Sequence, residues 1–398
     1  MNTYRILLAL FFPLLAALLG CNEEKLIGPG VDKDSAPGPV SDVQVENLPG
    51  GARISYSLPP DENLLYVKAE YTIRDGKTME VKSSFHRNFL EVEGFPDTRP
   101  YEVKLYAVSR GEKPSEPVVV NVNPLQPPVQ EAFESLELKR TFGGISVNYR
   151  NSGEADLALV VLAADSLGEL RQATTYYTKM KEGVFAARGF DTLERQFGVY
   201  VRDRWDNYSD TVFVRVKPFY EKELNKDLFR EVHLAGDYAE PHNQGRSRMS
   251  NLWDRDTSPT AVTALFSTVP GGGFPQSFTF DMGVTASLSR LVYYPRANGS
   301  FAYTNQPRLF EIWGSNNPDS TGTWDSWTKL MDCEMIKPSG LPQGEVTEDD
   351  RAYAMAGIEY ELPVGTPPVR YIRFKTLEVW SGSNISIVEL TLFGNDEQ

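Results

Sequence analysis

The sequence contains few of the residues from which metal sites and thiol-based active sites are built. Its 398 residues include two cysteines and three histidines, and His86, His233 and His242 are far apart in the chain. The G-x-S-x-G, P-loop and dinucleotide-binding glycine patterns are also missing. These absences argue against a serine hydrolase, a zinc enzyme and a nucleotide-dependent enzyme. We therefore expect a protein without catalytic activity.

Basic residues are scarce relative to acidic ones. The chain has 40 Lys and Arg against 54 Asp and Glu, which gives a formal net charge of −14. A broad nucleic-acid interface needs a basic face that offsets the phosphates. We expect no nucleic acid among the partners of this protein.

Aromatic residues and turn formers are plentiful. Aromatics make up 12% of the chain, and there are 27 prolines and 31 glycines. This composition favours short strands joined by many turns, and thus an all-β fold. At roughly 150 residues per domain, the length indicates two to four domains.

Residues 1–20 have the pattern of a secretory signal peptide. Arg5 is followed by an apolar run that Pro13 interrupts and that is too short to span a bilayer. The end of this run, Leu18-Leu19-Gly20-Cys21, resembles the lipobox of bacterial lipoproteins. The resemblance implies cleavage before Cys21 and attachment of lipid to its thiol, which would anchor the protein in a membrane. The alternative is an ordinary secretory signal in which Cys21 has no role.

Residues 21–37 are expected to form a flexible tether, because they mix Gly, Pro, Asp, Lys and Ser with little hydrophobic pattern. Asn22-Glu23-Glu24, directly after the cysteine, resembles the surface-export signal of Bacteroidetes lipoproteins. This resemblance implies a lipid-anchored protein of the outer membrane that faces the cell exterior.

Residues 38–125 alternate between apolar and polar side chains in short segments, as half-buried antiparallel strands do. The stretch from Leu90 to Tyr101 resembles the approach to the tyrosine corner of a fibronectin type III domain. The resemblance implies a β-sandwich in which the hydroxyl of Tyr101 bonds to nearby backbone.

A second copy of this unit is predicted at residues 126–218. Residues 118–124 align with residues 212–218 at an offset of 94, and Ser115 then aligns with Ser209. A repeat of this length suits one sandwich per unit. Trp205 lies in a predicted hairpin loop of the second copy, where its ring could pack into the turn or contact a ligand or a neighbouring domain.

Residues 219–398 carry a series of motifs in a fixed order. The main ones are Trp253-Asp254-Arg255-Asp256, Phe278-Thr279-Phe280, Tyr293-Tyr294-Pro295-Arg296, Ile312-Trp313-Gly314-Ser315, and Glu389-Leu390-Thr391-Leu392. The series resembles the discoidin, or coagulation factor type C, family of galactose-binding-like jelly rolls, which includes many carbohydrate-binding modules. The fold class that we expect is therefore two fibronectin III- or immunoglobulin-like β-sandwiches followed by a discoidin-like jelly roll. A helix is also expected within residues 219–234, which are rich in Glu, Lys and Leu.

The resemblance implies one structural Ca²⁺ in the last domain. Family members often hold this ion with an acidic loop and a carboxylate of the final strand. The matching positions here are Asp254, Asp256, Thr260 and Glu389. Such an ion needs six to eight oxygen ligands, some of them from backbone carbonyls. Arg255 stands where the family has a glycine, and the alternative is a turn in which the two aspartates cap backbone amides.

The resemblance also implies a glycan site at the loop end of the jelly roll. The matching residues are Arg296, which can donate a fork of hydrogen bonds to hydroxyls, and Asn305, which can donate and accept. Trp380 is the first choice for the ring that covers the apolar face of a sugar, and Tyr303 and Trp253 are second choices. The alternatives are a structural ion pair for Arg296 and a core position for Trp380.

The order of signal peptide, two fibronectin-like domains and a discoidin-like domain resembles Bacteroidetes lipoproteins from polysaccharide-utilisation loci. The resemblance implies a surface protein that binds a glycan or polysaccharide, beside a transporter or other glycan-binding proteins of the outer membrane. The alternative is an adhesion or assembly protein whose last domain binds another outer-membrane protein.

Overall fold

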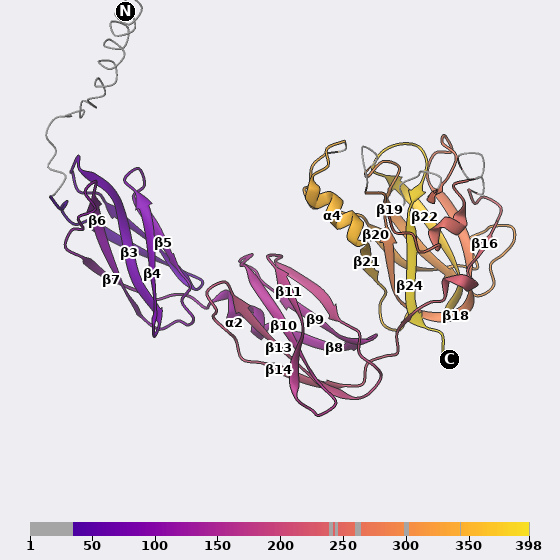
Figure 1. The fold of residues 1–398 in the computed structure, drawn as a ribbon, viewed down its shortest axis with the longest axis horizontal. Coiled ribbons are helices and arrows are strands. Elements are labelled where there is room, and N and C mark those ends of the chain that lie inside the picture. The colour runs from indigo at the N-terminus through magenta and orange to yellow at the C-terminus, as the bar shows by residue number, and fades with distance from the viewer. Residues whose placement is uncertain are drawn as a thin grey trace, which may run out of the picture.

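The computed structural model of the protein describes residues 35–238, 242, 246–258, 264–297, 302–342 and 344–397. Figure 1 shows three β domains that follow one another in chain order. The expected all-β class, with two sandwiches followed by a jelly roll, is confirmed.

The first domain packs a three-stranded sheet against a four-stranded one. The sheets have the strand orders β1-β2-β5 and β4-β3-β6-β7, and all neighbouring strands are antiparallel. Along β6, every second side chain from Tyr101 to Ala107 is buried, as the alternating sequence predicts. The strands are β1 Ser41–Leu48, β2 Gly51–Ser57, β3 Leu64–Arg74, β4 Lys77–Ser84, β5 Phe89–Glu93, β6 Tyr101–Ser109 and β7 Val118–Val122.

Tyr101 lies at the expected corner but bonds to a different group. Its hydroxyl donates to the carboxylate of Asp97 at 2.9 Å and accepts from Arg99 at 3.0 Å. The predicted bond to the backbone is instead made by Tyr71, whose hydroxyl donates to the carbonyl of Glu93 at 3.0 Å. The carboxylate of Asp97 lies within reach of the Tyr101 hydroxyl and accepts a stronger hydrogen bond than a backbone carbonyl does, which explains the difference.

The second domain repeats this arrangement. Its sheets have the orders β8-β9-β12 and β11-β10-β13-β14, preceded by the short helix α2 (Pro128–Glu134). Pro128 stands at the first helical position, where its fixed φ suits a helix and its missing N–H costs no hydrogen bond. The strands are β8 Glu137–Thr141, β9 Gly144–Arg150, β10 Leu157–Ala164, β11 Leu170–Thr178, β12 Glu182–Ala187, β13 Arg195–Asp203 and β14 Val212–Val216.

The two serines that the repeat aligns make the same contacts. The Ser115 hydroxyl accepts from the amide of Ala107 at 3.1 Å, and the Ser209 hydroxyl accepts from the amide of Val201 at 2.8 Å. Each serine also donates to the carbonyl of the next residue. The repeat in the sequence therefore corresponds to a structural repeat at the level of single hydrogen bonds.

The third domain is built around one long strand, β18 (Gln276–Tyr294). Its first half pairs with β22 (Val369–Val379), and its second half pairs with β24 (Glu389–Asn395). A register shift between Asp281 and Ala286 separates the halves, so that one strand contributes to both faces of the barrel. The remaining elements are β15 Lys222–Glu223, β16 Arg230–Val232, β17 Phe266–Ser267, β19 Pro307–Ser315, β20 Thr328–Glu334, α4 Glu348–Ala356, β21 Ile358–Glu361 and β23 Ser386–Ile387.

The helix expected within residues 219–234 is wrong. This segment forms β15, a three-residue 3-10 turn from Lys226 to Leu228, and β16. β15 pairs with β24 and β16 pairs with β18, so sheet edges that would otherwise be open recruit the segment into strands.

A buried ion pair crosses one face of the third domain. Asp237 and Arg373 have side chains that are 3% and 2% exposed, and the guanidinium Nη2 lies 2.8 Å from Asp237 Oδ1. The hydroxyls of Ser277 and Thr279 donate to the same carboxylate at 2.8 and 2.6 Å. The carboxylate is thus fully paired, which is the condition for burying a charge.

The first two domains meet at the hairpin loop that contains Trp205. Its ring lies against Gly94, where an added Cβ would come within 3.0 Å of it, and Asn207 Nδ2 donates to the Gly94 carbonyl at 2.9 Å. Arg204 pairs with Glu93 at 2.6 Å. Trp205 therefore contacts a neighbouring domain, which is one of the roles predicted for it.

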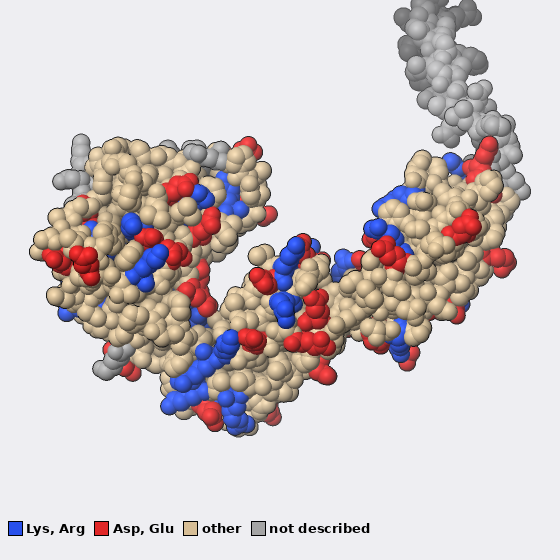
Figure 2. All heavy atoms as spheres, turned by 180° about the vertical axis from the view of Figure 1, so that it is seen from behind, with Lys and Arg blue, Asp and Glu red and all other residues tan. Residues whose placement is uncertain are grey.

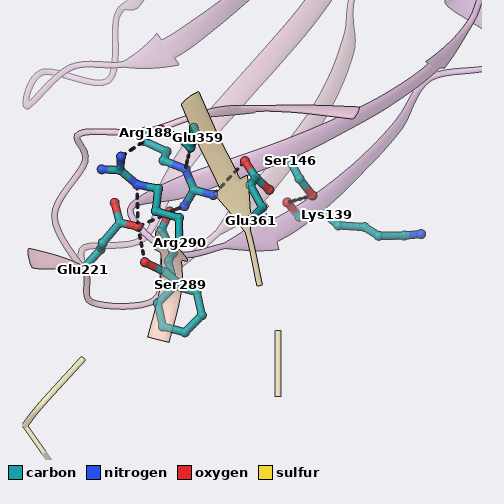
Figure 3. Close-up of polar contacts among 9 residues, drawn as sticks. Lys139, Ser146, Arg188, Glu221, Ser289, Arg290, Glu359 and Glu361 are labelled. Carbon is teal, nitrogen blue, oxygen red and sulfur yellow. Dashed lines mark hydrogen bonds and ion pairs between the residues drawn. The ribbon is translucent and has the colours of Figure 1, made fainter. Parts of the chain in front are cut away.

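The second and third domains meet at a network of two arginines and three glutamates (Figure 3). Glu221 accepts from Arg188 at 3.2 Å, from Arg290 at 3.3 Å and from the Ser289 hydroxyl at 2.6 Å. Glu359 and Glu361 complete the network through Arg188 and Arg290. Glu221, Arg188 and Arg290 are largely removed from solvent, whereas Glu359 and Glu361 lie at the edge of the network.

Candidate functional site

Three predicted ligand-binding residues lie at one end of the third domain. Arg296 follows β18, Asn305 precedes β19, and Trp380 follows β22. The buried Gln306 connects them, because its side-chain oxygen accepts from the Arg296 amide at 3.0 Å and its carbonyl accepts from the Trp380 amide at 3.0 Å. The structure therefore brings the three loops together.

Asn305 is held in place by its own backbone and by Gly382. Its amide donates to Ser381 at 2.8 Å, and its carbonyl accepts from Ser386 at 2.7 Å. An added Cβ at Gly382 would lie 1.6 Å from Asn305 Oδ1, so only glycine permits this approach. The side-chain amide of Asn305 is therefore positioned over the loop that contains Trp380.

Trp380 is half-buried among cations and one tyrosine. The ring of Tyr303 meets it edge-on at 5.8 Å, and Lys337 Nζ lies 4.9 Å from its centroid. The guanidinium of Arg308 lies 5.8 Å from the same ring. Both cations make cation–π contacts with the indole, while Arg308 also pairs with Glu334 and Glu378.

Tyr303 and Trp253 do not have the exposure that a sugar-stacking role requires. Tyr303 is 3% exposed and its hydroxyl donates to the Asp350 carbonyl at 2.8 Å, while Trp253 is 8% exposed. The Trp253 ring packs against Phe229 and Phe280 in the core. Both second-choice predictions are wrong, because neither buried ring has a free face for a sugar.

Two residues that organise this end of the domain escaped sequence analysis. Gln306 is fully buried and joins the converging loops, and Lys337 is 3% exposed. The ammonium of Lys337 donates to the carbonyls of Leu341, Pro342 and Glu345 at 2.8–3.2 Å. A lone glutamine or lysine in a loop segment carries no sequence signal for such a role.

The acidic loop forms the turn that was the alternative to calcium binding. Asp254 Oδ1 accepts from the amide of Asp256 at 2.9 Å, and Asp256 Oδ1 accepts from the amide of Ser258 at 3.1 Å. Both aspartates are exposed, and Arg255 pairs with Asp227 at 2.9 Å. Thr260 lies outside the described residues.

Glu389, the carboxylate that would complete a calcium site, is fully buried and pairs with the ammonium of Lys226. The same ammonium donates to the Thr391 hydroxyl at 2.7 Å. Burial raises the pKa of Glu389 to about 7, and Lys226 acts against this rise. Within the described ranges, no three His, Cys, Asp or Glu side chains are grouped so that they could hold a metal ion. Among the described residues, the ammonium of Lys226 therefore lies beside the carboxylate that the calcium prediction assigned to the ion.

Thermal unfolding tests whether calcium contributes to this domain. Because the Lys226 ammonium already neutralises Glu389, we expect the melting temperature to be the same in calcium and in a chelator. Measurement by differential scanning fluorimetry of chelator-treated and calcium-loaded protein would decide the point. A rise of several degrees with calcium, abolished in an Asp254→Asn variant, would contradict this expectation and restore the predicted site.

The predicted lipidation site, Cys21, lies outside the described residues. In the part of the chain that the structure covers, none of the helices is both long enough and apolar enough to cross a membrane.

Acidic and basic side chains are interspersed over most of the face shown in Figure 2.

Three domain families match successive parts of the chain. All are described as domains of unknown function: DUF4959 at residues 37–124, DUF5126 at residues 125–227, and DUF5000 at residues 253–394. No curated protein matches the chain.

Solved structures resemble the chain to different extents. A carbohydrate-binding module, CpGH89CBM32-5 from Clostridium perfringens in complex with GalNAc-beta-1,3-galactose, is 12% identical over 43% of this chain and 99% of its own, with a TM-score of 0.31. A two-domain fibronectin type III segment of chicken tenascin is 12% identical over 45% of this chain and 99% of its own, with a TM-score of 0.22. The structure named SusE-like protein BT2857 is 35% identical over 68% of this chain and 99% of its own, with a TM-score of 0.45. Because that identity extends over nearly the whole of the relative, the chain belongs to the family of SusE-like proteins.

Proposed function

We propose that this protein binds a glycan or polysaccharide at the cell surface through the loop end of its third domain. The observation that supports this most directly is the convergence of Arg296, Asn305 and Trp380 around the buried Gln306. Arginine and asparagine supply directional hydrogen bonds for hydroxyls, and the indole supplies a flat apolar surface. Partial burial lowers the pKa of Arg296, which nevertheless stays protonated at neutral pH.

In this proposal the protein holds its ligand without transforming it. Binding at one shallow site is weak, and many anchored copies on one surface strengthen it. The first two domains set the distance between the membrane and the site. Capture near an outer-membrane transporter or other glycan-binding proteins would then serve polysaccharide utilisation.

Substitution of Trp380 tests the site. We expect Trp380→Ala to weaken retention on the polysaccharide that the wild type binds by roughly tenfold or more, because the apolar platform is lost. The measurement is affinity electrophoresis against a panel of plant and host polysaccharides. Trp313→Ala, at a half-buried tryptophan of β19 in the same domain, is the matched control and should retain binding.

A variant that preserves packing guards against misfolding. Trp380→Phe keeps the contact with Tyr303 and should retain the wild-type melting temperature and part of the binding. The proposed site is wrong if no polysaccharide in the panel binds the wild type. It is also wrong if Trp380→Ala and Trp313→Ala have the same effect on binding.

The alternative function is binding of another outer-membrane protein through the same domain. The observation in its favour is the exposure of two apolar side chains of this domain, Ile336 just after β20 at 63% and Met355 on α4 at 60%. Exposed apolar surface of this kind is more typical of protein interfaces than of sugar sites. Co-purification of a stoichiometric outer-membrane protein, lost in an Ile336→Asp variant, together with an empty polysaccharide panel, would favour this function.

The membrane anchor is proposed to be lipid on Cys21. Cys21→Ser should remove the lipid and release the protein from the membrane fraction, because a hydroxyl cannot form the thioether. Fractionation followed by mass spectrometry of the N-terminal peptide measures this. An unmodified wild-type cysteine would support the ordinary secretory signal instead.

A further inference from the structure

The outward face of the four-stranded sheet in the second domain has an unusual composition. Side chains alternate along each strand, and those of Leu159, Val161, Phe197 and Val199 point into the core. The intervening positions therefore form the outward face of this sheet. They are Leu170, Gln172, Thr175 and Tyr177 on β11, Ala158, Val160, Leu162 and Ala164 on β10, Gln196, Gly198, Tyr200 and Arg202 on β13, and Phe213 and Arg215 on β14.

Aromatic rings dominate the exposed part of this face. Tyr177 is 70% exposed, Phe213 is 50% exposed, and Tyr208, which forms a bridge with Arg202 of β13, is 60% exposed. The small aliphatic side chains between them, Ala158 and Val160, are 4% and 1% exposed. The exposed aliphatic side chain of this face is Leu170, at 38%, near the far end of β11. Around Tyr177, what reaches solvent is mainly ring surface and arginine.

The corresponding face of the first domain is different. It carries paired charges, with Lys68 bonded to Glu70 at 2.5 Å and Lys82 to Glu80 at 3.1 Å. Such a face is typical of a strand surface that meets only water. Since the two domains share one fold, the fold does not require the aromatic face of the second domain.

The charge of the aromatic face has one sign. Among the outward positions of β10, β11, β13 and β14, none is Asp or Glu, whereas Arg202 and Arg215 are present. This is notable in a chain with a net charge of −14. A partner that complements the face would carry negative charge.

A shallow pocket of about 340 Å³ lies at one end of the face, between Tyr177 and Arg202. The Arg202 guanidinium donates to the Tyr177 hydroxyl at 3.4 Å across it. Two carboxylates also line the pocket, but Asp156 pairs with Lys179 at 2.9 Å, and Asp203 accepts from the amides of the Trp205 loop. The groups left for a ligand are a ring face and guanidinium donors.

We propose that this face of the second domain is a separate binding site for an anionic polysaccharide, one that carries carboxylate or sulfate groups. Tyr177 stacks on a sugar ring, Arg202 and Arg215 bind its anionic groups, and the other exposed rings extend the platform along the sheet. The site goes beyond the function proposed for the third domain and does not depend on it.

The test uses the chain from residue 22 onward and two charged probes, polygalacturonate and chondroitin sulfate, with neutral dextran as the reference. We expect retardation of the wild type by at least one charged probe, falling as salt increases, and none by dextran. Tyr177→Ala and Arg202→Ala should each weaken binding roughly tenfold. Arg202→Lys keeps the charge and should retain part of the binding. Tyr106→Ala, at the aromatic position of the corresponding face in the first domain, is the matched control and should have no effect.

The Trp380→Ala variant separates this site from the one in the third domain. If it retains retardation by the charged probe while Tyr177→Ala loses it, the two sites are independent, as proposed. If Trp380→Ala alone abolishes retardation, or if the Tyr177 and Arg202 variants bind as the wild type does, the site on the second domain is overturned and the third-domain site stands. Absence of any binding to the charged probes also overturns the second-domain site, and leaves the third domain to be judged on neutral polysaccharides.

Discussion

Replacing Arg373 by methionine is expected to lower the free energy of unfolding of the third domain by about 3–5 kcal/mol. The substitution keeps the volume of the side chain but leaves the carboxylate of Asp237, 3% exposed, without its cation. It also removes a bond to the carbonyl of Gly322 at 2.9 Å and the contact with the ring of Trp324 at 4.0 Å. Urea unfolding followed by tryptophan fluorescence measures the change.

The same strand provides a matched control. Arg370 also pairs with an aspartate, Asp281, at 2.8 Å, but its side chain is 44% exposed. Arg370→Met should cost about 0–1 kcal/mol, because solvent screens an exposed pair. If the two variants lose the same free energy of unfolding, burial does not determine how much the Asp237–Arg373 pair contributes to stability.

The second large effect is expected at the junction between the second and third domains. Glu221→Gln removes the most buried negative charge of the network, which Arg188 and Arg290, 12% and 15% exposed, both contact. Loss of one partner of a buried, hydrogen-bonded charge pair typically costs about 2–5 kcal/mol. We expect the two domains to lose their fixed orientation, seen as a larger radius of gyration in small-angle scattering and as separated calorimetric transitions.

Glu361→Gln is the control for this junction. Glu361 contacts Arg188 at 2.9 Å but is 37% exposed, and Arg188 keeps Glu221 as a partner when it is lost. The radius of gyration of the Glu361→Gln variant should match that of the wild type. An unchanged radius of gyration in Glu221→Gln would mean that other contacts, such as the packing of Phe142 on Phe219, hold the domains together.

The parts of the fold that sequence analysis predicted are those with local periodicity. Alternating strands and the 94-residue offset depend on neighbouring residues and on a comparison of the chain with itself. The buried pair of Asp237 and Arg373 joins residues 136 positions apart, and no local pattern marks it. The helix predicted within residues 219–234 is wrong for the same reason. This segment pairs with the distant strands β24 and β18, and no local pattern marks that pairing.

The candidate site was predictable in its position and less so in its details. Arg296 and Asn305 match positions that the resemblance gives, and the loops that carry them and Trp380 do converge. Tyr303 was chosen as an aromatic residue in the right loop, but its burial depends on contact with Asp350. Likewise, the partner of Glu389 is Lys226, 163 residues earlier, which no motif specified.

The two domain junctions also determine how the molecule would bear tension. Where the chain leaves each sandwich, it forms a parallel bridge back to the first hairpin of that sandwich, Pro49 with Leu125 and Phe142 with Phe219. Under the proposed function, a polymer bound to the third domain of a chain anchored at Cys21 would pull on these two points in series. Each bridge would have to break before a β7 or β14 strand could be peeled from its sheet, so these short bridges act as mechanical clamps on the two sandwiches.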